Sequence, residues 1–305
     1  MRIKAFYHPD YYLPLPDGHP FPMEKFPGAY HRLTPHPRME IEQVSLFPRD
    51  QIERVHHPFY LDRVNFDDAE HGRRGLNRSE RHRLGLPARE NLLYRSMLET
   101  SGTILAAKAA LKEGIAANLA GGTHHAFPDR GLGFCVLNDV AVAIRGLQKD
   151  RPNLHFLVLD TDAHQGNGTH AIFRDDPHVF TYSIHVGRNY PAHKEPGDMD
   201  IPLPRWADGK QYWEAFAESA EAAFARTEPD LVFWIAGADP HHQDRFGQMA
   251  LTDGDFRRRD QHVWTLCREF NCPVVVLYGG GYNRERGKTA ALHAATLETL
   301  AAIPG

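Results

Sequence analysis

Short apolar runs alternate with helical patterns along most of the chain after residue 90. The apolar runs predict strands at 154–159, 179–184, 231–236 and 273–278. Apolar residues at helical spacing predict helices over 90–112, 137–149, 208–226, 253–270 and 287–302. Continuous apolar strands that alternate with helices are typical of a parallel sheet covered on both faces.

The first third of the chain lacks this regular pattern. Eight prolines fall between Pro9 and Pro37, and proline interrupts both helices and central strands. We therefore predict a short strand at 3–7, followed by loops packed on the rest of the protein. The stretch 71–87 holds five arginines and is interpreted as a solvated loop, with a substrate-facing rim as the alternative. Thr252 and Asp255 predict a capping box at the start of the helix over 253–270.

Composition narrows the class of protein. The 305 residues are 42% hydrophobic and 24% charged, as expected for a globular chain, and we predict one domain over 1–305. The net charge of −4 argues against a nucleic-acid partner. No run approaches the ~20 apolar residues that cross a bilayer, and the first residues lack an apolar signal core. Three cysteines without a C-x-x-C pair favour a reduced, cytoplasmic protein; the oligomeric state is not indicated.

Polar and glycine-rich motifs follow the apolar runs. Ligands of open α/β sheets bind beyond the carboxyl ends of the strands, so these motifs are the candidate functional positions. They are HH at 124–125, DTDAHQGNG at 160–168, SIH at 183–185, GADPHH at 237–242 and GGGYN at 279–283.

The motif DTDAH predicts a metal site. Alternate residues of an extended chain point to one side, so Asp162 and His164 can converge on one ion, with Asp160 nearby. Asp239, at the end of another predicted strand, is the candidate third ligand. One histidine with carboxylates suits Zn²⁺ or Fe²⁺, and three protein ligands leave an open, catalytic position. A single aspartate at a strand end is as often a helix or turn cap, so the prediction depends on the combination.

Two further motifs fit catalysis beside such an ion. His124 and His125 precede a glycine-rich loop, and a metal-activated water needs a general base within reach. Tyr282 follows three glycines at a strand end and could donate to a developing oxyanion, with a buried structural tyrosine as the alternative. The nucleotide-binding fingerprints, the G-x-S-x-G nucleophile motif and H-E-x-x-H are all absent from the sequence.

Four motifs in order give the chain a resemblance to a known family. GGTHHAFPDRGLGFCVLND, LDTDAHQGNGTH, AGADPHHQDRFG and GGGYN together resemble the histone deacetylase superfamily. HPFPMEK at 19–25 and DRFG at 244–247 resemble the bacterial class IV-like members. The resemblance implies an α/β, single-domain, three-layer arginase–deacetylase fold with a central parallel sheet of roughly eight strands.

The resemblance also implies an activity and its catalytic groups. The expected reaction is hydrolysis of the acyl amide of acyl-lysine, or of a related primary amine, by a metal-activated water. The implied zinc ligands are Asp162, His164 and Asp239, with Fe²⁺ as the alternative ion. The other implied catalytic groups are the general base His125, its charged neighbour His124, their respective partners Asn167 and Asp160, and the carbonyl-polarising Tyr282.

A substrate tunnel and a structural K⁺ site follow from the same resemblance. The tunnel would be lined by Gly133, Phe134, Tyr190, Phe246 and, near its foot, Lys25, which could attract the carboxylate product. K⁺ would be held by carbonyls of Asp160, Asp162 and His164, by the Ser183 hydroxyl and by the Ile184 carbonyl. A second K⁺ would lie around Phe173, Asp176 and Val179. Gly85 stands where class I enzymes carry a rim aspartate that clamps the substrate backbone.

Several functional alternatives stay open at this point. Within the superfamily they are an acetylpolyamine amidohydrolase and an acetoin-utilisation type deacetylase. A more remote alternative is an arginase-like ureohydrolase, which needs two manganese ions and more carboxylate ligands than these motifs supply. The other is a catalytically silent acyl-lysine binding module, which would be expected to lose the tyrosine, a ligand or the histidine pair.

Overall fold

Eight parallel strands form one sheet. The computed structural model describes residues 2–64, 75–87, 91–285 and 287–303. The strand order is β2-β1-β3-β8-β7-β4-β5-β6, and every neighbouring pair is parallel. The strands are β1 (Ile3–Tyr7), β2 (Met39–Gln43), β3 (Ile115–Asn118), β4 (Phe156–Asp160), β5 (Val179–Val186), β6 (Met199–Leu203), β7 (Leu231–Ile235) and β8 (Val274–Leu277).

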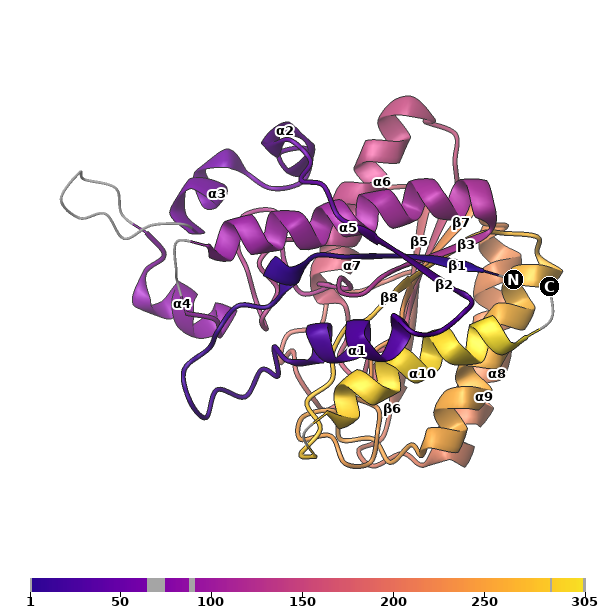
Figure 1. The fold of residues 1–305 in the computed structure, drawn as a ribbon. Coiled ribbons are helices and arrows are strands. Elements are labelled where there is room, and N and C mark those ends of the chain that lie inside the picture. Colours follow the sequence, from indigo (N-terminus) through magenta and orange to yellow (C-terminus); the bar gives the residue numbers. More distant parts are fainter. Residues whose placement is uncertain (1, 65–74, 88–90, 286, 304–305) are drawn as a thin grey trace.

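Helices cover both faces of the sheet (Figure 1). On one face lie α5 and α6, and on the other lie α1, α8, α9 and α10. The helices are α1 (Lys25–Leu33), α2 (Arg49–Ile52), α3 (Pro58–Val64), α4 (Arg78–Leu84), α5 (Leu92–Glu113), α6 (Asp139–Asp150), α7 (Asn167–Phe173), α8 (Gly209–Thr227), α9 (Asp253–Glu269) and α10 (Lys288–Ala302), with a 3₁₀ turn at Pro9–Tyr11. The predicted three-layer α/β fold is confirmed.

The predicted elements after residue 90 all form. All four predicted strands and five predicted helices are present, with bounds shifted by a few residues. The predicted capping box is also present at the start of α9. There Thr252 Oγ accepts from the backbone N–H of Asp255 at 3.3 Å, and the Asp255 carboxylate accepts from the N–H of Thr252 at 2.8 Å.

The first third of the chain is more regular than predicted, because its prolines sit where helices tolerate them. Pro27 and Pro58 lie in the first turns of α1 and α3, and Pro48 directly precedes α2. The N–H groups of a first helical turn have no partner within the helix, so a missing N–H costs little there. The strands β2 and β6, which were not predicted, are the two edges of the sheet, where Pro202 of β6 is tolerated.

The arginine-rich stretch was wrongly interpreted as a loop. Residues 71–74 lie outside the described residues, but 78–84 form the helix α4. A capping box starts this helix: Asn77 Oδ1 accepts from the N–H of Glu80, and the Glu80 carboxylate accepts from the N–H of Asn77. The helix ends at Gly85, which is left-handed at φ 75°.

The topology brings the candidate motifs together at the carboxyl ends of the strands. Because all strands are parallel, the loops that follow β3, β4, β7 and β8 leave the sheet on the same side, at the carboxyl ends of the strands. These loops carry the motifs from His124 to Tyr282. Within the described ranges, no helix is both long and apolar enough to cross a bilayer.

Candidate active site

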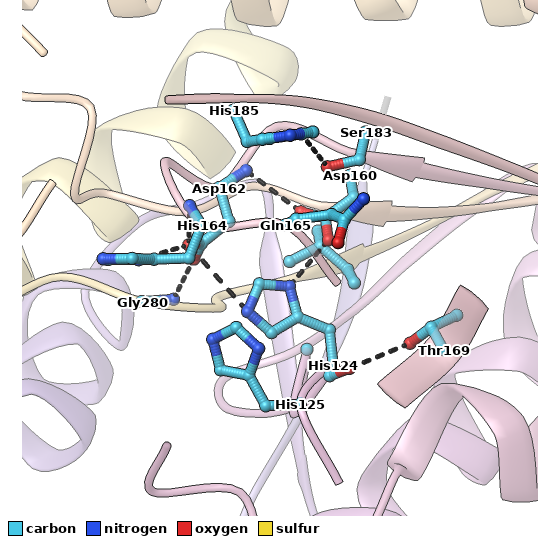
Figure 2. Close-up of polar contacts among 12 residues, drawn as sticks. His124, His125, Asp160, Asp162, His164, Gln165, Thr169, Ser183, His185 and Gly280 are labelled. Carbon is cyan, nitrogen blue, oxygen red and sulfur yellow. Dashed lines mark hydrogen bonds and ion pairs between the residues drawn. The ribbon is translucent and has the colours of Figure 1, made fainter. Parts of the chain in front are cut away.

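Three buried side chains from two loops converge on one point. One ligand atom each of Asp162, His164 and Asp239 lies within 4.8 Å of the others. Nδ1 of His164 is 3.0 Å from Asp162 Oδ1 and 2.8 Å from Asp239 Oδ2. Figure 2 shows Asp162 and His164 together in the loop that follows β4.

Backbone N–H groups hold the two carboxylates in place. Asp239 Oδ1 accepts from the N–H of Ala163 at 2.9 Å, which leaves Oδ2 facing the histidine. Asp162 Oδ2 accepts from the N–H of Gly280 at 2.7 Å (Figure 2). A Cβ at Gly280 would lie 2.3 Å from Asp239 Oδ2 and 2.6 Å from Asp162 Oδ2. Only glycine lets this backbone approach both carboxylates.

The donor set fits a divalent cation. Two buried carboxylates and one imidazole nitrogen converge, and in the described chain their only ion-pair partners are histidines. Burial, together with Asp162, raises the pKa of Asp239 to about 7. Burial lowers the pKa of His164, but the carboxylates of Asp239 and Asp162 outweigh it and raise that pKa well above 6.5. The carboxylates thus favour positive charge at His164 Nδ1, and the donors N, O and O are those that Zn²⁺ and Fe²⁺ prefer.

His124 is paired with a carboxylate. Its Nδ1 donates to Asp160 Oδ2 at 2.6 Å, and its Nε2 is 3.9 Å from Asp162 Oδ1 (Figure 2). Burial lowers the pKa of His124, but Asp160 and Asp162 outweigh it and raise the pKa to about 9. At neutral pH this ring is therefore an imidazolium.

His125 has a neutral partner. Its Nδ1 lies 2.9 Å from Asn167 Oδ1, and because an amide oxygen can only accept, Nδ1 carries the hydrogen. Burial, and then the positive charges of His124 and His164, lower the pKa of His125 well below 6.5. The ring is therefore neutral at neutral pH, with a free lone pair on Nε2.

Tyr282 is positioned by a carboxylate that the sequence analysis did not single out. Asp244 accepts from the backbone N–H groups of Tyr282, Phe246 and Gly247, and its side chain is buried. Burial, with Asp162 and Asp239 nearby, raises the pKa of Tyr282 well above 10, so its hydroxyl stays a donor. Asp244 is part of the DRFG motif, but the motif gives no sign of its bond to a residue 38 positions away.

Aromatic side chains line a cavity of about 300 Å³ that leads to His164 and His125. Phe134 and Tyr190 both line it, and the Tyr190 ring is 5.0 Å from that of His125. Gly133 also lines the cavity, and a Cβ there would be 2.8 Å from both the Tyr190 ring and the His125 ring. Phe246 lines the outer part, and its ring is 5.2 Å from that of Tyr282.

The helix α4 packs against Gly133 and Phe134, which line the cavity. The backbone carbonyls of Arg83 and Leu84 accept from the N–H groups of Gly133 and Phe134 at 3.0 and 2.8 Å. A Cβ at Gly85 would lie 2.8 Å from the Phe134 ring, in a left-handed conformation that side chains rarely adopt. The packing of α4 against Phe134 therefore excludes an aspartate at this position. Residues 82–85 line the cavity, and 78–84 form a helix rather than a solvated loop.

Lys25 lies in a second, inner cavity. It is buried, its Nζ donates to the Gly279 carbonyl at 2.9 Å, and it lines the cavity together with Tyr282 and Asp162. Burial lowers its pKa to about 8 against the attraction of Glu99.

The residues expected around K⁺ lie close together. Ser183 pairs with Asp160 in the β4–β5 register, and Ile184 follows it. The Ser183 hydroxyl is 3.0 Å from Nδ1 of His185 (Figure 2). For the second site, the N–H of Asp176 donates to the Phe173 carbonyl and that of Val179 donates to the Asp176 carbonyl, so these residues lie in two consecutive turns.

Comparison with known sequences identifies relatives over most of the chain. A family model described as the histone deacetylase domain matches residues 19–298. An uncharacterized protein from Picosynechococcus sp. is 40% identical over 285 residues, which cover 92% of this chain and 93% of that protein. The acetoin utilization protein AcuC of Staphylococcus aureus is 30% identical over 264 residues, covering 80% and 67% of the two chains.

Solved structures share the fold. A crystal structure of an HDAC homolog complexed with SAHA gives a TM-score of 0.81 at 23% identity, covering 98% of this chain and 84% of that one. The HDA15 HD domain gives 0.79 at 20% identity, covering 98% and 90%. The superpositions confirm the fold, and the family model spans nearly the whole sequence. The chain belongs to the histone deacetylase family.

Proposed function

We propose that this protein is a metal-dependent deacylase that hydrolyses the acyl amide of an acyl-lysine side chain or of a related primary amine. One observation carries the proposal: a neutral His125, the ligand His164 and the hydroxyl-bearing Tyr282 all line the same 300 Å³ cavity. Membership of the histone deacetylase family supports the same reaction class.

The proposed ion site is Asp162, His164 and Asp239. A divalent ion bound there, Zn²⁺ or alternatively Fe²⁺, supplies a Lewis acid for the carbonyl and lowers the pKa of water toward ~7. The two carboxylate ligands are fixed by backbone N–H groups, so they are oriented before the ion binds.

The histidines divide the proton chemistry. His125 accepts the proton of the attacking water at Nε2 and returns it to the leaving amine, while Nδ1–H stays bonded to Asn167. His124, held as an imidazolium by Asp160, stabilises the negative charge that develops nearby. The Tyr282 hydroxyl donates to the carbonyl oxygen as it gains charge.

The tunnel orients the substrate. The methylene stem of the acylated side chain would pass between Phe134 and Tyr190, with apolar contact along its length. At the inner end, the ammonium of Lys25 would attract the carboxylate product in the second cavity. A structural K⁺ beside Ser183 would help fix the loop that carries the ligands.

One comparison favours a second candidate function. Similarity to the acetoin utilization protein AcuC spans 80% of the chain. An acetoin-utilisation type deacetylase would use the same site on a different acylated substrate, so the alternative concerns the substrate rather than the chemistry.

Metal removal and a substrate panel test the proposal together. We expect the purified protein to contain one tightly bound divalent ion and to hydrolyse at least one of a series of acyl-lysine peptides, from acetyl to long-chain. Chelation should abolish turnover, and Zn²⁺ or Fe²⁺ should restore it. Asp239→Asn should lose the ion, whereas Asp150→Asn, at the exposed end of α6, should keep it. Full turnover by a verified metal-free protein would refute the proposal.

Tyr282→Phe tests the electrophile. The substitution removes one hydroxyl and little volume, and loss of an oxyanion donor typically lowers kcat by ~10²–10³. Metal content should stay unchanged. Turnover near the wild-type level would make Tyr282 a structural residue and require another electrophile.

A further inference from the structure

We propose that the mouth of the cavity selects acyl-lysine in an acidic or neutral sequence context and disfavours polycationic substrates, including acylated polyamines. The inference rests on the proposed deacylase function and adds the charge of the substrate to it. It starts from the side chains around the opening of the 300 Å³ cavity.

Two arginines lie at this opening. Arg83 is exposed at the end of α4 and lines the cavity together with the tunnel residues. Arg245 stacks beside the opening, with its guanidinium carbon 5.6 Å from the centre of the Phe246 ring. No aspartate or glutamate lines the cavity in the part of the chain that the structure describes.

Arg83 is held at the mouth by its backbone. Its carbonyl accepts from the N–H of Gly133 at 3.0 Å, and Gly133 lies beside Tyr190. One guanidinium nitrogen donates to Ser79 Oγ at 3.0 Å. The charge therefore stays next to the tunnel wall even though the side chain is exposed.

The described carboxylates around the mouth are engaged elsewhere. Glu80, one turn from Arg83, forms its ion pair with Arg63, and Arg83 contributes only the last of the attractions that lower the pKa of Glu80. Glu195, which lines the neighbouring groove, pairs with Arg174, and Asp129 pairs with Arg130. The position of Gly85 cannot supply a carboxylate, because a side chain there would meet the Phe134 ring. The positive charge of Arg83 is therefore available to a substrate.

A groove beside the tunnel would bring a neighbouring residue of the substrate within reach of Arg83. This groove has a volume of about 280 Å³ and shares Arg83 and Tyr190 with the 300 Å³ cavity. Arg130 and Glu195 also line the groove, and each is already paired, Arg130 with Asp129 and Glu195 with Arg174. A peptide whose acylated lysine enters the 300 Å³ cavity would place a flanking residue in or near this groove, where an acidic side chain would approach the charge of Arg83.

The exposure of Arg83 to solvent limits the expected selectivity. Exposed charge pairs are weak and are screened by salt, so we expect discrimination of about 1.4- to fivefold per flanking charge at low ionic strength. An acylated polyamine keeps ammonium groups close to the mouth and is repelled in the same way. A purely structural role is the other explanation for these cations, because basic residues stabilise the C-terminal end of a helix such as α4.

Three peptides of equal length separate these explanations. Each carries one acyl-lysine, flanked by aspartates, by serines or by lysines, and an N-acetylated polyamine is assayed beside them with the metal-loaded protein. We expect kcat/KM to fall in the order acidic, neutral, basic, with the polyamine lowest, and the differences to shrink as salt is raised. Equal values for the three peptides, or a preference for the basic one, would overturn the inference.

Charge reversal identifies the residue. Arg83→Glu should lower the acidic-to-basic ratio of kcat/KM about tenfold, and Arg83→Gln, which disturbs the helix end less, should lower it by a smaller factor. Arg226→Glu is the matched control, because Arg226 is an exposed arginine in the last turn of α8, at the opposite end of the sheet. An equal change with Arg226→Glu, or none with either Arg83 variant, would overturn the role of Arg83. Failure of the proposed deacylase function itself is distinguishable, because the serine-flanked peptide would then not be hydrolysed at all.

Discussion

His124 and His125 are neighbours on one loop and are both buried, yet their surroundings give them opposite charge. Burial lowers the pKa of both rings. At His124 the carboxylates of Asp160 and Asp162 outweigh burial and raise the pKa to about 9. At His125 the charges of His124 and His164 lower the pKa further, well below 6.5, and the neutral Asn167 does not offset them. Two identical side chains thus differ in charge at neutral pH. The comparison teaches that the charges around each ring, rather than the ring itself, set its protonation state, and with it the role we propose for it.

Removal of the proton acceptor should have the largest effect. His125→Ala should lower kcat by about 10²–10⁴ at every pH, because among the described residues it is the one buried, neutral imidazole that lines the cavity. Metal content and melting temperature, measured on the same sample, should remain close to wild type. A normal acidic limb in the pH–rate profile of this variant would show that His125 is not the base.

Removal of the fixed cation should cost less. His124→Ala takes away electrostatic support but leaves the proton-transfer group, so measurable turnover should persist at neutral pH. Steady-state kinetics of the two alanine variants, prepared side by side, decide the order. If His124→Ala is inactive while His125→Ala turns over, the two roles are reversed.

Giving His125 a carboxylate partner like that of His124 should shift the pH–rate profile rather than change the maximal rate. Asn167→Asp places a carboxylate behind His125, which raises its pKa, so the acidic limb of kcat/KM should shift to higher pH. The shift is measured from rates between pH 4 and 9, with Asn153→Asp, on the exposed turn after α6, as the control. An unchanged limb would mean that another group controls it.

The pH dependence of the free energy of unfolding should show the smallest effect. The folded pKa of His124 is raised from 6.5 to about 9, so its stabilising contribution is complete below about pH 6.5 and is lost as the pH rises through about 9. Asp160→Asn removes the main attraction and should weaken this dependence. Melting temperatures of both proteins from pH 6 to 10 test it. A parallel loss in the two proteins would show that the pair contributes nothing to the pH dependence.

The sequence predicted the elements whose pattern is local. Continuous apolar runs identified β4, β5, β7 and β8, because a central strand must be apolar on both faces. The same pattern could not identify the edge strands β2 and β6, which keep one side in solvent and carry polar residues. The helices α1 and α3 escaped prediction because proline was interpreted as a breaker, although at the first turn it is tolerated.

At the site, the sequence predicted residues but not their support. The parallel order of strands explains why Asp162 and Asp239, 77 positions apart, lie together. Their catalytic roles stay predictions that rest on the family resemblance. The bond from Asp244 to the N–H of Tyr282 and the contact between α4 and the tunnel wall join segments that no spacing rule connects, so only the structure reveals them.

The close approach at Gly280 has a consequence for related genomes. A single methyl group at this position would lie 2.3 Å from Asp239 Oδ2, so alanine would have to push the ligands apart. A relative could therefore retain every ligand, both histidines and the tyrosine and still be a pseudoenzyme, through one substitution with no chemistry of its own. When a survey of sequences separates active from inactive homologues, the residue at this position is as informative as the ligands themselves.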